Sequence, residues 1–246
     1  VEKKSVMRAF FEFCASNGVN KLTLLSAAKA YTLLAQVADA RGPLRANVYR
    51  KNLLAARNWG RVYIEGFPQS VSPFEIVQPF QATHTERYVP PEEHVVKVLR
   101  SASGQDLVML LTFFFTGARR GEVFRLSWSK DVNLDEGRIR LIDHKGKNGQ
   151  VRVRWCDIHP ELGKALRWWL EARPCKVDNV FMQMHCDGMM VEPLQQRSKL
   201  MGTLCKRAGV EPFGFHAIRH CSAAVIFKAV GLNGAQVFLG TARNHH

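Results

Sequence analysis

The sequence predicts a mainly α protein with one small antiparallel β-sheet, an α+β fold arranged as two domains. Three observations lead to this prediction. Apolar residues recur at helical spacing over most of the chain, which is the pattern of amphipathic helices. Five prolines fall between residues 66 and 91, where no periodicity is sustained. Apolar and polar residues alternate over 138–142 and 151–155, as they do in half-buried strands.

The first domain, predicted over residues 1–80, is expected to contain three helices. In the first helix apolar residues lie three or four positions apart, and Asn17-Gly18 follows as a typical C-terminal stop. The three expected helices are Val6–Cys14, Thr23–Ala40 and Leu44–Glu65. A linker is predicted over 81–89, because prolines dominate this region and helical signals resume only at Pro91.

The second domain, predicted over residues 90–246, combines further helices with the small sheet. The apolar run Leu107–Phe115 predicts a buried core helix. Between the two alternating segments, Gly146, Asn148 and Gly149 predict a hairpin turn. Other helices are expected near 119–126, 160–172, 193–208, 215–230 and 233–240, with a short strand at 180–182.

The composition narrows the classes of function. The chain has 35 Lys and Arg against 21 Asp and Glu, a formal charge of +14 and a pI of about 9.9. This excess favours polyanionic partners, nucleic acid first and acidic membrane surfaces second. Hydrophobic residues make up 46% of the chain, so we expect a packed core. The longest apolar run is too short to span a membrane, and no signal peptide is visible.

The six cysteines are scattered and form no C-x-x-C pair. This distribution favours reduced, buried thiols in an intracellular protein. His185-Cys186 is the one His-Cys pair, and it has no partners at the spacing of zinc ligands. We therefore expect no metal site.

The third predicted helix, Leu44–Glu65, carries a row of cations and no acidic residue before its end. Such a helix is expected to have one buried face and one basic face, and the basic face is suited to phosphate contacts. An ordinary solvated face is the alternative. The candidate DNA contacts here are Arg45, Arg50, Lys51 and Arg57.

The segment Thr116-Gly117-Ala118-Arg119-Arg120-Gly121-Glu122 joins the apolar helix to the next one. Its glycines allow a tight turn and close packing. Two guanidinium groups directly after a buried helix are costly unless an anion or a carboxylate meets them. The segment therefore indicates an anion site, and the alternative is a pair of surface arginines beside Glu122.

The segment His216-Ala217-Ile218-Arg219-His220 places an imidazole and a guanidinium three positions apart, and so on one helical face. One group can carry a proton and the other is a fixed charge, which suits a phosphate site. The hairpin turn adds Lys145 and Lys147. A lysine at a hairpin tip can reach into a groove and donate a proton, although solvated turn lysines are common.

In this order, the T-G-x-R-x-G-E segment, a hairpin lysine, the H-x-x-R-H segment and Leu239-Gly240 resemble the catalytic domain of the tyrosine recombinases, the phage-integrase family. The resemblance extends from Pro90 to the end of the sequence. The preceding residues are similar to the helical core-binding domain of that family, through 48–59 and Ser72-Pro73-Phe74.

The resemblance implies a site-specific DNA recombinase, an integrase of a mobile element. In the family a tyrosine hydroxyl attacks a DNA phosphodiester, so that a 3′-phosphotyrosyl bond forms and a 5′-hydroxyl leaves, without a metal or other cofactor. The implied partners are double-stranded DNA core sites and other protomers in a synaptic tetramer, with no membrane. The implied location is the cytoplasm of a bacterial or phage-infected cell, at the nucleoid.

The resemblance also implies roles for single residues. Arg119 and Arg219 would hold the nonbridging oxygens, with His216 as general base or oxygen ligand. Lys147 would protonate the leaving 5′-oxygen, because its position before the second strand fits the register of the family hairpin. The neighbouring Lys145 and Arg120 are then expected to contact DNA.

The sequence departs from the family pattern at two places. Thr241 follows Leu-Gly where the family usually has His or Trp, so a hydroxyl would hydrogen-bond the phosphate there unless His245 or His246 replaces it. The family tyrosine lies about ten residues beyond Leu-Gly, whereas the tyrosines of this sequence all precede Arg119. The nucleophile could be disordered, removed by truncation or truly missing.

Three alternatives share part of this pattern. A DNA-binding protein of the same fold without cleavage activity would lack only the tyrosine. A relaxing enzyme similar to the type IB topoisomerases would share the charged site, although the compact core-binding domain favours a recombinase. A basic RNA-binding protein would require aromatic stacking motifs that this sequence does not contain.

Overall fold

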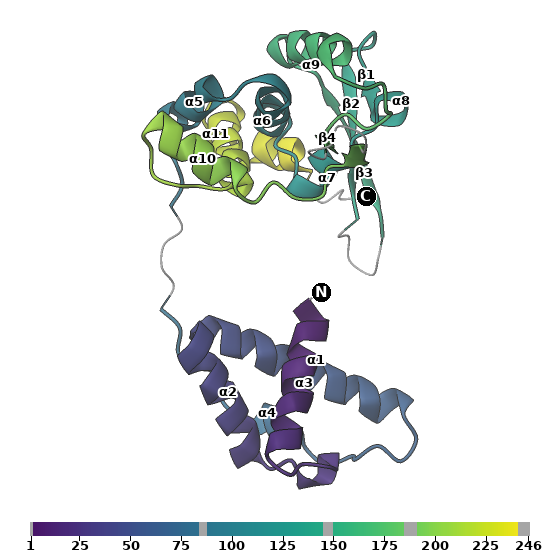
Figure 1. The fold of residues 1–246 in the computed structure, drawn as a ribbon, viewed down its shortest axis with the longest axis vertical. Helices are drawn as coiled ribbons and strands as arrows, with labels where there is room; N and C mark the ends of the chain where they lie inside the picture. Colours follow the sequence, from purple (N-terminus) through teal and green to yellow (C-terminus); the bar gives the residue numbers. More distant parts are fainter. Residues whose placement is uncertain (1, 84–87, 145–149, 185–190, 241–246) are drawn as a thin grey trace. The chain divides into compact units, whose positions relative to one another are not determined.

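The structure is a computed structural model, and it describes residues 2–83, 88–144, 150–184 and 191–240. Contacts within the chain divide it into two compact units, residues 1–86 and 87–246, which are described separately below. Figure 1 shows both units as ribbons. The N-terminal unit is helical among its described residues, and the C-terminal unit contains helices and two small antiparallel sheets. The predicted fold class is confirmed.

The N-terminal unit consists of four α-helices and a single 3-10 turn within residues 2–83. In chain order they are α1 (Glu2–Ser16), η1 (Leu22–Leu24), α2 (Ala27–Arg41), α3 (Pro43–Tyr63) and α4 (Pro73–Ile76). Ser26 caps α2 by accepting a hydrogen bond from the backbone of Lys29 at 3.2 Å. Helix α2 therefore begins later than the predicted Thr23, because η1 occupies residues 22–24.

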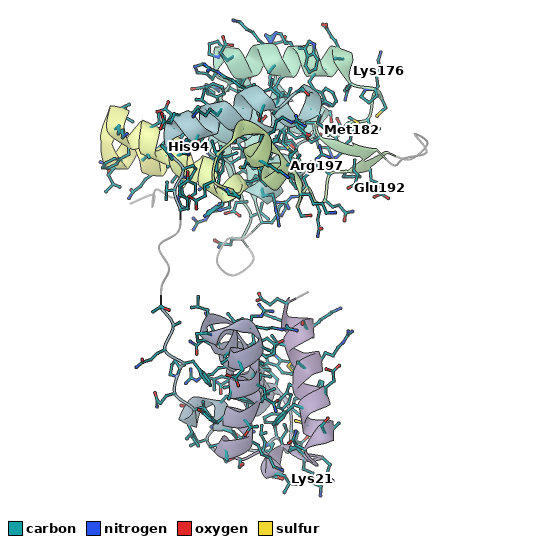
Figure 2. The ribbon with its side chains drawn as sticks, turned by 60° about the vertical axis from the view of Figure 1, so that its left-hand side comes forward. Lys21, His94, Lys176, Met182, Glu192 and Arg197 are labelled. Carbon is teal, nitrogen blue, oxygen red and sulfur yellow. The ribbon has the colours of Figure 1, made fainter. Side chains whose placement is uncertain are left out.

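The core of this unit follows from the apolar spacing of its helices. Val6, Phe10 and Phe13 of α1 are all buried, at positions four and three apart on one face. They join buried side chains from each of the other helices (Figure 2). Representative members are Leu33 and Leu34 of α2, Tyr49 and Leu53 of α3, and Phe74 of α4.

The C-terminal unit is built around the apolar helix α6 (Gly104–Thr116), which packs against helices on several sides (Figure 1). The other helices are α5 (Glu92–Ser101), α7 (Arg120–Phe124), α8 (Trp128–Asp131), α9 (Pro160–Ala172), α10 (Leu200–Ala208) and α11 (Phe215–Leu239). Helix α6 contacts α5, α7, α9 and α11. Its buried residues include Met109, Leu110 and Phe113, so the predicted core helix is confirmed.

The larger sheet has the strand order β1-β2-β3, and all of its pairs are antiparallel. Its strands are β1 (Val132–Asn133), β2 (Arg138–Asp143) and β3 (Arg152–Asp157). Ile139 and Leu141 of β2 are buried, while the residues between them are more exposed, so the predicted alternation is confirmed in that strand. A second sheet pairs β4 (Met182–Met184) with β5 (Val191–Pro193).

One predicted boundary in the C-terminal unit is wrong. The helix expected over 193–208 begins only at Leu200, because residues 191–193 pair with β4 as strand β5. The break expected between helices near 215–230 and 233–240 is confirmed, because α11 consists of two helical segments on either side of a kink at Gly231, where φ is 76°. Glycine tolerates this left-handed angle without steric cost, and the chain therefore bends there.

Helix α11 is long and apolar enough, by length and composition alone, to cross a membrane. The same helix contacts α5 and α6 of the C-terminal unit and carries the buried cation Arg219. A single helix of this kind is weak evidence for a membrane span.

Candidate phosphate-binding site

The turn that follows α6 brings Arg119 to the start of α7. Gly117 ends α6 in the left-handed conformation, with φ of 56°, and Arg119 occupies the N-cap position of α7. The backbone N–H of Arg119 donates to Oε2 of Glu122 at 2.8 Å, which satisfies a donor that the helix itself cannot meet. Glu122 is therefore a carboxylate that supports the arginine.

The guanidinium of Arg119 is held by two carboxylates. Its Nη1 donates to Oε1 of Glu122 at 3.1 Å and to Oδ2 of Asp143 at 2.6 Å. The Glu122 side chain is 3% exposed, whereas that of Arg119 is 36% exposed. One edge of the guanidinium is therefore fixed inside the protein while part of the side chain stays accessible to a ligand. Asp143, at the end of β2, was not predicted.

Arg219 approaches the same turn from α11. The residue is 6% exposed, and its Nη1 donates to the backbone carbonyl of Gly117. Its Nη2 donates to the carbonyl of Leu239 at 2.9 Å. Arg219 thus connects the turn before Arg119 to the C-terminal end of α11. The structure brings the two predicted arginines into one site.

The pKa of Arg219 is lowered to about 10, below the ordinary value of an arginine, and burial is the largest cause. The positive charges of Arg119 and Arg154 also act to lower this pKa, while the carboxylates of Glu122 and Asp143 act to raise it. Arg219 is therefore a cation at neutral pH, although neighbouring cations disfavour its charge. An anion in the site would relieve that repulsion.

Arg154, on strand β3, is a third guanidinium that sequence reasoning missed. Its Nη1 and Nη2 both donate to the carbonyl of Thr116 at 3.2 Å, and Nη1 also donates to the carbonyl of Phe238 at 2.5 Å. Its Nη2 lies 3.6 Å from Oε2 of Glu122. Arg154 therefore ties together the ends of α6 and α11, beside Arg219. The alternating strand pattern predicted a polar residue here without indicating its partners.

His216 lies on the first turn of α11, and its side chain is exposed. Its ring centroid is 4.4 Å from that of His220, which is also exposed. Arg219, one turn further along, is buried. The predicted pair thus has an accessible imidazole and an enclosed guanidinium, which is an arrangement suited to a site at the protein surface.

The charges of this cluster favour one singly charged anion. Three guanidinium groups face two carboxylates, which leaves one positive charge uncompensated. Guanidinium N–H groups match the geometry of phosphate oxygens and stay charged. Fixed donors of this kind can stabilise the charge that develops when a phosphodiester is attacked. Arg120, the remaining arginine of the segment, is exposed.

Several predicted residues lie outside the described residues. They are Lys145, Lys147, Thr241, His245 and His246. The roles of these residues stay predictions. Among the side chains that the structure describes, no group of three or more His, Cys, Asp or Glu could hold a metal ion.

The predicted basic face of α3 is only partly present. Lys51 is exposed, but Arg45 forms an ion pair with the first residue of α1, and Arg50 donates to backbone carbonyls in and after α4. The expectation is wrong at Arg57, which is 6% exposed and lies in the interior of the N-terminal unit. Helical spacing allowed either face for this residue, and packing against the loop after α3 decided for the buried one.

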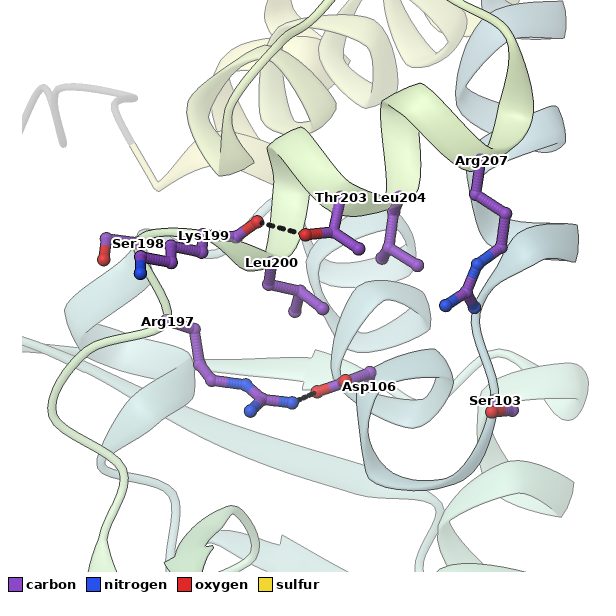
Figure 3. A pocket seen from close by; sticks show the side chains of 9 residues that line it. All are labelled: Ser103, Asp106, Arg197, Ser198, Lys199, Leu200, Thr203, Leu204 and Arg207. Atoms are coloured by element: carbon purple, nitrogen blue, oxygen red, sulfur yellow. Dashed lines mark hydrogen bonds and ion pairs between the residues drawn. The ribbon is translucent and has the colours of Figure 1, made fainter.

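A basic pocket of about 510 Å³ lies on the C-terminal unit, between the starts of α6 and α10. Its cations are Arg197, Lys199 and Arg207, and Figure 3 shows Arg197 turned towards Asp106, with which it forms an ion pair. Arg207 donates to the carbonyl of Ser101 at 2.9 Å. Four cations lie between residues 197 and 207 in the sequence, but no motif among them predicts this pocket.

The fold and the site together define a class of protein, one in which a helical N-terminal unit precedes a mainly α unit with an arginine-rich anion site. The family profile described as "Phage integrase family" matches residues 85–245. This match covers well over half of the chain, and the chain therefore belongs to the phage integrase family, the tyrosine recombinases. No curated protein matches the sequence significantly.

Solved structures share this fold at low sequence identity. A lambda integrase dimer bound to a COC′ core site matches with a TM-score of 0.72 and 17% identity, covering 99% of this chain and 68% of that chain. The XerH site-specific recombinase in a post-cleavage complex with palindromic difH substrate matches with a TM-score of 0.69 and 20% identity, over 96% and 70%. The Tn1549 transposon integrase in complex with a circular intermediate DNA gives 0.64 and 15%, over 89% and 79%.

Proposed function

We propose that this protein is a site-specific DNA recombinase, an integrase that cleaves and rejoins DNA strands through a 3′-phosphotyrosyl intermediate without a metal. The observation that carries the proposal is the convergence of Arg119 and Arg219, from segments far apart in the chain, on the turn at Gly117. The family membership and the shared fold support it. Glu122 bonds Arg119, while Arg154 bonds the carbonyls of Thr116 and Phe238, each next to a carbonyl that Arg219 bonds.

In this mechanism the scissile phosphate binds at the accessible edge of Arg119, beside Arg219 and His216. A tyrosine Oη attacks phosphorus and passes its proton to His216, which acts as general base. The bond to the 5′-oxygen breaks, and Lys147 supplies the proton that this oxygen takes up. The two arginines stabilise the negative charge on the nonbridging oxygens as the phosphorane forms. Rejoining is the same sequence in reverse, with a 5′-hydroxyl as nucleophile.

The nucleophile is the open part of this mechanism. The four tyrosines of the sequence are Tyr31, Tyr49, Tyr63 and Tyr88. Of these, Tyr88 alone belongs to the C-terminal unit, and its hydroxyl bonds Nδ1 of His94 at 2.7 Å. A second candidate function is a DNA-binding protein of the same fold without cleavage activity.

The proposed partners are duplex DNA and other protomers of the same protein. Arg120, Lys51 and the cations of the pocket at α10 are proposed DNA contacts, because they carry positive charge at or near the surface. Lys145 is proposed as a further contact on the family resemblance alone. The second half of α11 exposes apolar side chains, which suits a contact between protomers. They are Phe227, Val230, Leu232 and Val237.

The decisive experiment uses the protein in its natural full length with nicked suicide duplexes tiled across the DNA around its gene. A nick close to the cleavage point lets the short fragment that carries the 5′-hydroxyl diffuse away. Rejoining is then prevented, and the covalent intermediate accumulates. We expect a protein–DNA adduct that survives denaturant and forms equally in the presence of a metal chelator. No adduct should form with either of two variants, Arg119→Lys and Arg219→Ala.

Arg138→Ala is the matched control, because Arg138 is an exposed arginine of β2 whose ion pair with Asp157 spans 3.6 Å at the surface. It should form the adduct at the wild-type level. Tight, salt-sensitive DNA binding without any adduct would select the non-cleaving alternative. An adduct that persists in Arg219→Ala would refute the assigned site.

A further inference from the structure

The last part of α11 is a short helical segment with little buried surface. The kink at Gly231 separates residues 232–239 from the first part of the helix. Among these residues, all of which the structure describes, Ala235 alone is buried. A helix of about two turns is marginal in water by itself, and packing normally stabilises it. With a single buried side chain, this segment needs other contacts to hold a fixed position.

Two arginines supply such contacts at its last turn. Nη1 of Arg154 donates to the carbonyl of Phe238 at 2.5 Å, and Nη2 of Arg219 donates to the carbonyl of Leu239 at 2.9 Å. The last carbonyls of a helix have no partner within the helix, and a cation beside them is favourable. Arg219 belongs to α11 itself, whereas Arg154 comes from β3. Arg154 therefore links the sheet to the end of α11.

The same guanidinium also reaches the end of α6. Its Nη1 and Nη2 both donate to the carbonyl of Thr116 at 3.2 Å. Thr116 is the last residue of α6, and the turn that follows it leads through Gly117 to Arg119. The side chain of Arg154 is 18% exposed. One largely buried guanidinium thus joins the C-terminal ends of two helices, directly before the turn that carries Arg119.

The end of α11 fits closely around the stem of this arginine. A Cβ built on Gly240 would lie 2.7 Å from Cδ of Arg154 and 3.1 Å from its Nε. A side chain at this position would displace the stem of Arg154, and the guanidinium with it. The missing side chain of Gly240 therefore leaves the space that the bridge between the two helices occupies.

We propose that Arg154 is a positioning residue for strand cleavage, which fixes the end of α11 against the turn that carries Arg119. The inference rests on the proposed recombinase function. Arg154 acts through the carbonyls of Thr116 and Phe238 rather than on the phosphate. The chain leaves α11 at Gly240, and the family resemblance places the nucleophile beyond that point. A displacement of about 1 Å can lower the rate of a reaction on the order of 100-fold.

Single-turnover cleavage of the nicked duplex at saturating DNA separates positioning from binding. Arg154→Ala should form the adduct about 100-fold more slowly than the wild type. Its DNA affinity should equal that of Arg138→Ala, which removes the same charge at an exposed position of β2. Arg154→Lys keeps the charge but lacks the fork that spans both carbonyls, so its rate should lie between the two. A lower yield of adduct with an unchanged rate constant would show a loss of folded protein and overturn the inference.

The Gly240→Ala substitution tests the contact between Gly240 and Arg154. It should slow adduct formation in the wild type and have little further effect in Arg154→Ala, where the displaced stem is absent. Gly209→Ala is the matched control, because Gly209 ends α10 with φ of +66°, close to the +64° of Gly240, and a Cβ built there has nothing within 4 Å. Its cleavage rate should equal that of the wild type. Additive effects of Gly240→Ala and Arg154→Ala would contradict the inference.

Hydrogen exchange tests the fixation of α11 without DNA. The amides of residues 236–240 should exchange about 10-fold faster in Arg154→Ala than in the wild type, with no change in α9. A wild type that forms no adduct would overturn the proposed function, while faster exchange in the variant would still support the link between Arg154 and α11. Equal exchange in the two proteins would overturn the inference and leave the proposed function untouched.

Discussion

Each of the two units buries an arginine to the same degree, but the two side chains differ in their hydrogen-bond partners and neighbouring charges. Arg219 and Arg57 are both 6% exposed. Arg219 donates to two backbone carbonyls and lies near two carboxylates and two other guanidinium groups. The guanidinium of Arg57 donates hydrogen bonds to Ser70 and lies near the ring of Phe67, and two of its nitrogens have no hydrogen-bond partner among the described residues.

The comparison teaches that burial alone does not define the role of a cation. In the C-terminal unit the guanidinium is part of a network of carbonyls, carboxylates and other guanidinium groups, and the proposed phosphate site rests on this network. In the N-terminal unit two nitrogens of the guanidinium are buried without a hydrogen-bond partner among the described residues. The same residue type therefore belongs to a charged network in one unit and to an apolar interior in the other.

The largest loss of stability is expected from a substitution of Glu122, in the network around Arg219. The Glu122→Gln substitution removes a buried negative charge that contacts Arg119 and lies close to Arg154. We expect the free energy of unfolding to fall by about 3 kcal/mol, because three cations then face a single carboxylate. Chemical denaturation monitored by circular dichroism measures this change.

Glu161→Gln is the control for that prediction. Glu161 pairs with Lys164 at 3.0 Å on the surface of α9, with side-chain exposures of 61% and 76%. An exposed pair of this kind contributes less than about 1 kcal/mol, so stability should hardly change. Equal losses in the two variants would show that Glu122 does not hold a buried network.

Two glycines with a positive φ, one in each unit, allow the effect of side-chain packing to be separated from that of backbone strain. Gly117 has φ of +56° and a Cβ built there would lie 2.4 Å from the Phe238 ring, whereas Gly18 has φ of +63° and nothing within 4 Å. Gly18→Ala should cost about 1 kcal/mol for the left-handed backbone alone. Gly117→Ala should cost about 2 kcal/mol or more, since the ring that packs on the Arg119 turn must also move.

Thermal and chemical unfolding of both variants measure this difference. The Gly117→Ala variant should also bind DNA less tightly, because Arg119 directly follows the displaced turn. Losses of the same size at both positions would mean that contact with Phe238 does not constrain the site.

Local signals made much of the fold predictable. Pro160–Ala172 was predicted with the bounds of α9, since a proline at the first turn and regular apolar spacing both act within the segment. The start of α10 was missed because residues 191–193 pair with β4, which is a contact between separate segments. Helical spacing could not show that partner.

The residues of the candidate site also fall into those that local motifs predicted and those that only contacts between distant segments reveal. Arg119 and Arg219 were found because each lies in a short motif. Arg154 and Asp143 were missed because their partners are distant in the chain, Phe238 for the first and Arg119 for the second. Arg57 was predicted on an exposed face because its helix has cations on several sides, and only the loop after α3 determines which of them is covered.

The incomplete hydrogen bonding of Arg57 should affect the stability of the N-terminal unit. Arg57→Met removes a buried charge whose donors are only partly satisfied and replaces it with an apolar side chain of similar length. We expect the variant to be as stable as the wild type or up to about 1 kcal/mol more stable. A loss above about 2 kcal/mol in urea unfolding would mean that the Ser70 and Phe67 contacts outweigh the cost of desolvation.

The smallest expected effect is a difference in pH dependence at Arg219. Its folded-state pKa of about 10 lies below the ordinary value of an arginine, so above pH 10 the unfolded chain holds more protons than the folded one and this group makes stability rise with pH. Below pH 9 the group adds no slope. Between pH 8 and 10.5 the wild type should therefore gain slightly less than about 1 kcal/mol relative to Arg219→Gln. Urea unfolding of both proteins across this range measures the gain, and parallel curves would show that Arg219 keeps an ordinary pKa inside the site.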